Sequence, residues 1–221
     1  MNFLAHLHLA GVRAGGGGWH LPCGATLIGN LLPDLVRGRY RGPMPDPMAA
    51  GYRRHVCVDG WTDVSPGFLE SRARVRDHLG GVARRFSGVV VDVLFDHCLT
   101  LAWGRWCPLP LQVFQREAYG NIAATLGEEP DLLPRATVDT LQRFATERWL
   151  TSYTTEAGLA VTFERMGRRY SQRFRRTVDL SAVMDAWQAE RAALRAGFNT
   201  VYGELTERLQ AGRDAETPPT D

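Results

Sequence analysis

Residues 92–103, DVLFDHCLTLAW, read as a buried helix that carries charged groups in its interior. Apolar residues dominate the segment, yet Asp92, Asp96 and His97 interrupt it. A buried carboxylate without a partner is costly, so it normally becomes neutral or finds a partner. We therefore expect these groups either to lie at the edge of the helix or to be held inside the protein by a metal ion.

The composition of the chain is that of an ordinary globular protein. Its 221 residues, 44% of them hydrophobic, suit a single domain with a full core. The formal net charge of +2 indicates no particular partner, and we expect neither a nucleic-acid nor a membrane partner. No run of about 18 uncharged apolar residues occurs, so no membrane span is predicted.

The N-terminal segment and the cysteines both favour a cytoplasmic protein. The segment MNFLAHLHLAGV lacks the basic region and the purely apolar stretch of a signal peptide. Cys23, Cys57, Cys98 and Cys107 show no CxxC or zinc-finger spacing. We expect them to be free thiols, most of them buried.

Helical periodicity predominates and predicts an all-α, single-domain helical bundle over residues 1–210. Ser65 and Ser181 are candidate N-caps, and Pro66 suits a first helical position. The segment FLAHLHLA fits either a helix or a strand. The expected helices span residues 65–79, 111–126, 134–150, 155–171 and 181–209.

Three segments are predicted not to be helical. GVRAGGGGWHLP has four consecutive glycines, which are costly to hold in a helix, so we expect a flexible loop. RGRYRGPMPDPM has three prolines and is predicted to be a surface loop near residues 38–48. Residues 211–221 are predicted to be a disordered tail.

Polar residues spaced four apart recur within the first 97 residues. Residues i and i+4 lie on one face of a helix, so the members of each set can point to the same spot. On a helix His6 and His8 would point apart, so at most one of them would be a ligand there. The sets are Asn2 and His6, Asn30 and Asp34, His55 with Asp59 and Asp63, and Asp92 and Asp96.

These residue types suit a hydrolytic metal site. Neutral imidazole and carboxylate are the usual ligands of Mn²⁺, Fe²⁺ or Mg²⁺. Such a metal lowers the pKa of a bound water and so supplies a nucleophile near neutral pH. Asp96 and His97, together with His55 and Asp59, form the strongest group. The alternative is that each pair is only a solvated helix face or a cap.

Four N-terminal motifs resemble, in order and spacing, those of bacterial acyl carrier protein phosphodiesterases. They are MNFLAHLHLA, GNLLPDLVRG, GYRRHVCVDGWTD and VVVDVLFDHCLTLAW. RWLTSY, FERMGRRYSQR and AGFNTVYGEL resemble the C-terminal half of the same family. The resemblance implies an all-α relative of HD-type metal-dependent phosphohydrolases. It also implies removal of the 4′-phosphopantetheine arm from holo acyl carrier protein, with Mn²⁺ as the usual metal and Mg²⁺ or Fe²⁺ as alternatives.

The residues and the resemblance together define an expected site. Asp92 or Asp63 would act as a general base or orient a ligand. The family commonly has an arginine soon after the histidine that matches His55, whereas this chain has Val56 and Cys57 there. Arg54 is therefore the candidate to bind the phosphate. The expected metal ligands are His6, Asp34, His55, Asp59, Asp96 and His97.

All basic residues are arginines, and they cluster in residues 72–85 and 165–176. Because carrier proteins are acidic, either cluster is a candidate docking face, although each could be a plain solvated helix face. Two other functions stay open: a metal phosphohydrolase for a nucleotide or another small phosphodiester, and a non-catalytic helical binding protein. A carboxylate-bridged redox centre requires Glu-x-x-His pairs on two helices. No such pair occurs in the sequence, so this kind of centre is not predicted.

Overall fold

The computed structural model describes residues 1–36 and 38–215, and within them the fold is all-α, as predicted. No β-strand forms in these residues; an isolated bridge joins Val12 to Trp19 and closes the glycine-rich loop. In chain order the elements are α1 (Phe3–Leu9), α2 (Gly24–Leu35), α3 (Asp46–Val64), α4 (Pro66–His78), η1 (Gly81–Phe86), α5 (Ser87–Leu101), α6 (Trp103–Trp106), α7 (Leu111–Glu128), α8 (Arg135–Thr146), η2 (Trp149–Thr154), α9 (Glu156–Phe174), α10 (Ala182–Gln210) and η3 (Arg213–Ala215), where η denotes a 3₁₀-helix.

Several boundaries differ from the predicted ones. FLAHLHLA forms helix α1, so the helical alternative is correct. The helix expected over residues 134–150 ends at Thr146, and Arg148, in a left-handed conformation with φ 50°, turns the chain into η2. Neither Ser65 nor Ser181 caps its helix through its side chain. The expected tail is part of the described structure as far as residue 215, and residues 216–221 lie outside it.

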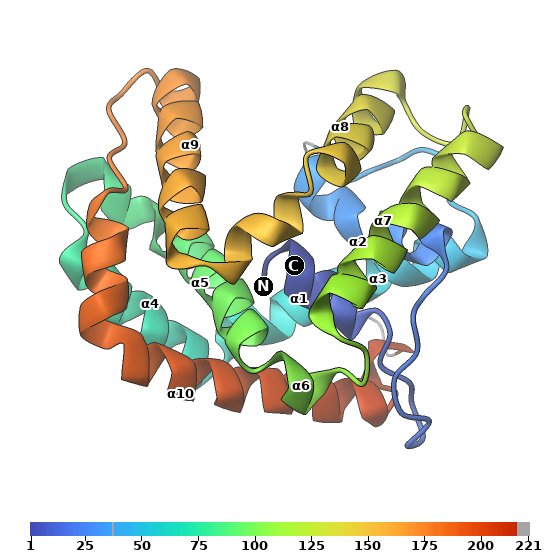
Figure 1. The fold of residues 1–221 in the computed structure, drawn as a ribbon, viewed down its shortest axis with the longest axis horizontal. Coiled ribbons are helices and arrows are strands. Elements are labelled where there is room, and N and C mark those ends of the chain that lie inside the picture. The colour runs from blue at the N-terminus through green and yellow to red at the C-terminus, as the bar shows by residue number, and fades with distance from the viewer. Residues whose placement is uncertain (37, 216–221) are drawn as a thin grey trace.

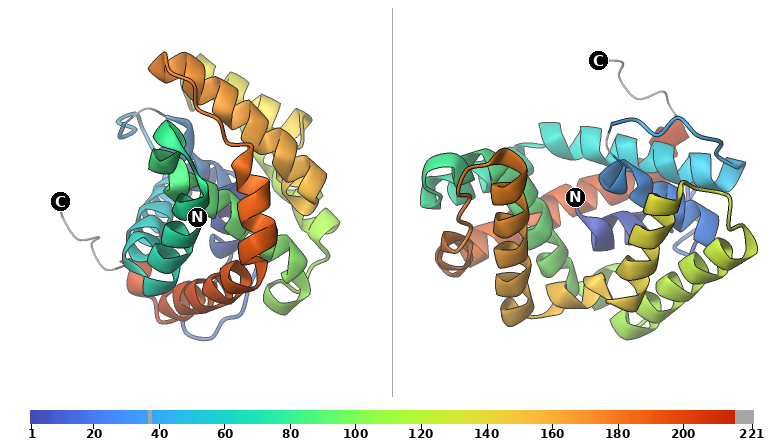
Figure 2. Two further views of the ribbon diagram at one scale, coloured as in Figure 1. Left: turned by 90° about the vertical axis from the view of Figure 1, so that its left-hand side faces the viewer. Right: turned by 90° about the horizontal axis from the view of Figure 1, so that it is seen from above.

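Helix α10 forms the base of the molecule and packs against α4 and α5 (Figure 1). Helices α8 and α9 rise from the body on either side of the N-terminus, and η2 joins them. Figure 2, seen from above, shows the N-terminus near the middle of the molecule, between these two helices. Helix α1 lies in the core, and every residue from Leu4 to Leu9 is buried. The N-terminal motif thus occupies the centre of the fold.

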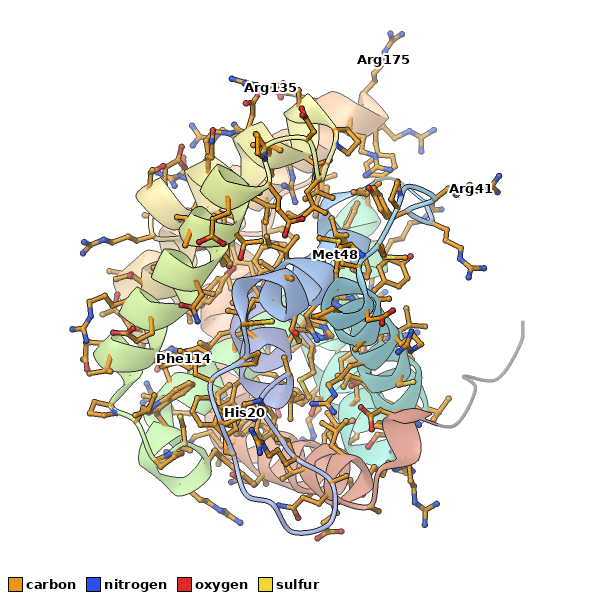
Figure 3. The ribbon with its side chains drawn as sticks, turned by 90° about the vertical axis from the view of Figure 1, so that its right-hand side faces the viewer. His20, Arg41, Met48, Phe114, Arg135 and Arg175 are labelled. Atoms are coloured by element: carbon orange, nitrogen blue, oxygen red, sulfur yellow. The ribbon has the colours of Figure 1, made fainter. Side chains whose placement is uncertain are left out.

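Glycines allow α2 and α3 to approach closely. A Cβ atom on Gly29 would overlap the carbonyl oxygen of Met48, and one on Gly51 would overlap that of Thr26. Met48, labelled in Figure 3, lies at this crossing. The crossing packs residues 48–51 of α3 against residues 26–29 of α2, about one turn before His55 and Asp34 on the same two helices. Two residues without side chains therefore set the separation of two predicted site helices.

The loop predicted near residues 38–48 ends earlier than expected, since α3 begins at Asp46 and Met48 is buried, whereas the expectation of free, mostly buried thiols is confirmed. Cys57, Cys98 and Cys107 are buried, Cys23 is exposed, and all four are free thiols. In the described part of the chain, no helix is both long enough and apolar enough to cross a bilayer.

Candidate metal centre and substrate cleft

Asp96 anchors helix α1 rather than facing the other polar residues. Its two carboxylate oxygens accept hydrogen bonds from the backbone N–H groups of Leu4 (2.8 Å) and Ala5 (3.0 Å). An N-cap side chain normally occupies this position, but Asn2 makes no side-chain cap bond. The positive end of the helix dipole also favours a carboxylate here. The prediction that Asp96 is a metal ligand is therefore replaced by a capping role.

His6 and His55 meet face to face at the centre of the predicted site. Their rings stack with centroids 3.7 Å apart and planes within 11° of parallel. Asp59 lies beside both, with one oxygen 3.0 Å from His6 Nε2 and the other 3.0 Å from His55 Nε2. Asp34 Oδ1 lies 3.8 Å from His55 Nε2. Donor atoms of His6, Asp34 and His55 all lie within 4.8 Å of one another.

Three of the four imidazole nitrogens of His6 and His55 lack a hydrogen-bond partner among the described residues. His55 Nδ1 donates to the backbone carbonyl of Asn30 (2.6 Å), so in the neutral ring Nε2 presents a lone pair. Within the described residues His55 Nε2 and both ring nitrogens of His6 are buried without a hydrogen bond, even though Asp59 is near. An imidazole lone pair that faces a carboxylate at 3.0 Å is unfavourable unless a proton or a metal ion lies between them. The donor set fits a divalent metal that binds imidazole and carboxylate.

The ionisation of these groups agrees with a metal site. Burial, and then the neighbouring His55, lower the pKa of His6 to about 3, so its ring is neutral at pH 7. Burial opposes the charge on Asp59, yet His6, the Met1 amino group and His55 hold its pKa well below the usual range. Burial raises the pKa of Asp34 to about 6. Neutral His6 and ionised Asp59 are in the forms that bind metals, whereas Asp59 raises the pKa of His55 against the effect of burial, so metal binding at this ring competes with a proton.

The two predicted general bases lie at different depths. Asp92 Oδ1 accepts a hydrogen bond from the amino group of Met1 (2.9 Å), whose nitrogen lies 3.5 Å from Asp59. Burial raises the pKa of Asp92. Asp63 lies one helical turn beyond Asp59 and is exposed. Asp92 is thus the carboxylate that borders the cluster from the α5 side.

Two of the predicted site residues point elsewhere. His97 Nδ1 donates to the carbonyl of Tyr153 (2.7 Å), and its ring packs edge-on against Trp187, so His97 does not join the cluster. Arg54 donates from Nη1 to three backbone carbonyls of residues 9, 10 and 12 and pairs with Asp214. These contacts engage both side chains elsewhere and give no support to His97 as a ligand or to Arg54 as the phosphate-binding residue. Arg54 instead fixes the C-terminal end of α1.

His8 is directed away from His6, as expected for residues two apart on a helix. Its Nε2 donates to the carbonyl of Trp106 (3.2 Å), and its Nδ1 accepts from the hydroxyl of Tyr202 (2.7 Å). The ring stacks on Trp19 of the glycine-rich loop, with centroids 5.5 Å apart. His8 therefore ties α1 to α6, α10 and the loop.

The cluster opens into a cavity of about 940 Å³ between α8, η2 and α9. Met1, Asp34 and Asp92 line the inner part of this cavity, and Trp149 and Tyr153 line it from η2. We call this cavity the cleft. Four arginines also line the cleft: Arg143, Arg148, Arg165 and Arg169. The basic cluster predicted over residues 165–176 includes the α9 arginines, but no sequence pattern predicted that Arg143 and Arg148 would line the same cleft.

Comparison with known proteins agrees with this architecture. A family model described as acyl carrier protein phosphodiesterase matches residues 1–205. The acyl carrier protein phosphodiesterase of Pectobacterium atrosepticum is 35% identical over 170 residues, which cover 76% of this chain and 79% of that protein. The one from Escherichia coli O6:K15:H31 is 33% identical over 219 residues, which cover 97% of this chain and 100% of that protein.

No solved structure matches this chain, so the expected relationship to HD-type phosphohydrolases stays a prediction. The family match includes all the residues of the candidate cluster, and the curated relatives cover most of the chain. The chain belongs to the acyl carrier protein phosphodiesterase family.

Proposed function

We propose that this protein is a metal-dependent phosphodiesterase that removes the 4′-phosphopantetheine arm from holo acyl carrier protein and leaves the apo-carrier protein. The observation that carries the proposal is the convergence of His6, Asp34 and His55 at the inner end of an arginine-lined cleft. Family membership supports the reaction class. We expect the reaction to occur in the cytoplasm, where the four free thiols would stay reduced.

His6, Asp34 and His55 are the residues that would hold the metal, with Asp59 beside both imidazoles. The metal, when bound, supplies Lewis-acid chemistry at a phosphoryl oxygen or at a water. Mn²⁺ is our expected ion, with Mg²⁺ or Fe²⁺ as alternatives, because the donors are nitrogen and oxygen atoms and no thiolate. The Asn30 carbonyl orients His55 through its Nδ1 proton, and this contact directs Nε2 to the cluster.

Asp92 is the residue we assign as the proton acceptor. It lines the cleft beside the cluster, and burial raises its pKa, which strengthens it as a base. Asp63 is exposed and does not line the cleft, so we assign it no chemical role. The leaving group would be the serine oxygen of the carrier protein, which departs toward the open side of the cleft.

Mass measurement of a holo acyl carrier protein after incubation with this protein and Mn²⁺ tests the proposal. We expect the carrier to lose the mass of 4′-phosphopantetheine, and EDTA to prevent the loss. His55→Gln should abolish it by removing a metal ligand. His97→Gln is the matched control, because this histidine lies outside the cluster and should retain cleavage.

A holo-carrier protein that keeps its mass would contradict the proposed substrate. Hydrolysis of bis(p-nitrophenyl) phosphate by the same sample would then favour a phosphohydrolase for small diesters. A sample that takes up no Mn²⁺ and hydrolyses neither compound would favour a non-catalytic binding protein. Its stability should then be the same with and without Mn²⁺, because only an ion that binds the folded state raises its stability.

A further inference from the structure

Two parallel rows of side chains run along α9, and the first two members of each row line the cleft. Residues at i, i+4 and i+8 lie along one line of a helix, so each row is continuous over two turns. One row is cationic and consists of Arg165, Arg169 and Arg173; the other is apolar and consists of Met166, Tyr170 and Phe174. The Arg169 guanidinium lies 5.5 Å from the ring centre of Tyr170, and that of Arg173 lies 5.3 Å from the ring centre of Phe174.

The cationic row has no carboxylate partner among the described residues. Arg168, on the same helix but outside both rows, pairs with Glu164. In the other basic cluster, Arg74 pairs with Glu70 and with Glu190. No such ion pair involves the arginines of the row anywhere in the described part of the chain. Arg72, Arg76 and Arg85 of the other cluster are also without ion pairs among the described residues, but none of them lines the cleft, whereas Arg165 and Arg169 do. Unmatched charge together with position at the cleft therefore favours α9 over residues 72–85.

The cleft has a net positive charge larger than one phosphodiester requires, since four arginines and the Met1 amino group line it against the three carboxylates of Asp34, Asp92 and Glu147. Arg165 and Arg169 line one wall, and Arg143 and Arg148 line the other, also without ion pairs among the described residues. A phosphodiester carries a single negative charge. The remaining cations therefore fit further anionic groups that enter with the scissile bond, which a small diester lacks and an acidic protein segment supplies.

The apolar row adds a second requirement for the partner. Tyr170 stacks on Phe86 with ring centroids 4.4 Å apart, and this packing holds the ring of Tyr170 in place within the apolar row. Phe174 is nevertheless 47% exposed, and Val89 of the adjoining helix α5 is 41% exposed. Exposed aromatic surface next to unmatched charge is typical of a protein-binding face.

We propose that this face of α9 is the docking surface for an acidic, amphipathic segment of the protein that carries the phosphodiester. Carboxylates of the segment pair with the arginine row, and its apolar side chains pack on Met166, Tyr170 and Phe174. The inference deepens the proposed function and rests on it, since it names the part of the macromolecular substrate that α9 recognises. Residues 72–85 have no part in this docking.

Steady-state kinetics with holo acyl carrier protein and direct binding of apo-carrier protein test the surface. Arg169→Ala/Arg173→Ala should raise KM and weaken apo-carrier binding about tenfold at low salt, with kcat within about twofold of the parent. The difference should shrink at about 0.5 M salt, where exposed charges are screened. Phe174→Ser should raise KM about threefold with no salt dependence. Arg168→Ala is the matched control and should change neither quantity more than about twofold.

The two proposals fail in distinguishable ways. A parent protein that binds apo-carrier protein but leaves the holo-carrier intact would overturn the proposed function and keep the docking surface. Cleavage of holo-carrier protein with equal KM for parent and Arg169→Ala/Arg173→Ala would overturn the docking surface alone. An equal loss of turnover on bis(p-nitrophenyl) phosphate would also overturn it, because the arginines would then act on the phosphodiester itself.

Discussion

Substitution of Asp96 decides whether this residue caps helix α1 or binds the metal. Its oxygens accept hydrogen bonds from the backbone N–H groups of Leu4 at 2.8 Å and Ala5 at 3.0 Å. Asp96→Asn keeps one side-chain oxygen as an acceptor, and asparagine is a good N-cap residue. Asp96→Ala removes both acceptors. The two substitutions therefore separate the capping role from any role as a metal ligand.

The expected loss of stability follows from the two backbone N–H groups. Asp96→Ala leaves both buried and without a partner, and each such group costs about 1–3 kcal/mol. Part of this cost is offset, because burial raises the pKa of Asp96 to about 7 and the parent already bears the cost of a buried carboxylate. We expect a loss of about 3 kcal/mol for Asp96→Ala and about 1 kcal/mol for Asp96→Asn.

Urea unfolding of the metal-free protein measures these losses, and calorimetric titration with Mn²⁺ measures metal affinity. If Asp96 is a helix cap, the Asp96→Asn variant should bind Mn²⁺ nearly as well as the parent. Asp34→Asn should weaken Mn²⁺ binding about tenfold or more, because it removes a ligand. Should Asp96→Asn retain full stability yet bind no Mn²⁺, the capping assignment would be wrong and Asp96 would be a ligand.

Three further predictions follow from contacts around the site. Gly51→Ala should destabilise the fold by about 1–3 kcal/mol and weaken Mn²⁺ binding, since its Cβ would push α2 from α3 and displace His55; thermal unfolding and calorimetry check this. His97→Phe should cost about 1 kcal/mol, because it loses the bond to the Tyr153 carbonyl, but should leave Mn²⁺ affinity unchanged in the same titration. Burial lowers the pKa of His8 to about 4, so as the pH falls His8 is protonated in the unfolded chain before it is protonated in the folded protein. The free energy of unfolding, measured by urea titration, should therefore fall by about 3 kcal/mol between pH 6.5 and pH 4.

The helical fold was predictable because its signals are local. Helical periodicity, the proline at residue 66 and the run of glycines at residues 15–18 each act within a few residues, and the corresponding helices and loop are present. The left-handed turn at Arg148 was not predictable in this way, since no glycine marks it and the surrounding packing holds it. That turn ends α8 four residues earlier than expected and creates η2, which lines the cleft.

The candidate site was predicted in part. The spacing of four placed His55 and Asp59 on one face of α3, and their side chains do meet. The same rule argues against Asp96 and His97 acting together, because neighbouring residues on a helix point about 100° apart. Arg54 shows what spacing cannot reveal: its partners are backbone carbonyls at the end of α1, which only tertiary packing brings near.

The polar groups of residues 92–103 show why a buried charge predicts a partner but not its identity. Asp92 pairs with the Met1 amino group, Asp96 with the N-terminus of α1, and His97 with the carbonyl of Tyr153. Each partner is a backbone or terminal group that the pattern of side chains cannot encode. His97 Nε2 is also buried without a hydrogen bond, but the unpaired nitrogens of His6 and His55 face carboxylates. We therefore expect the metal where unpaired imidazole nitrogens and carboxylates meet, and α5 contributes by fixing the position of the helix that carries His6.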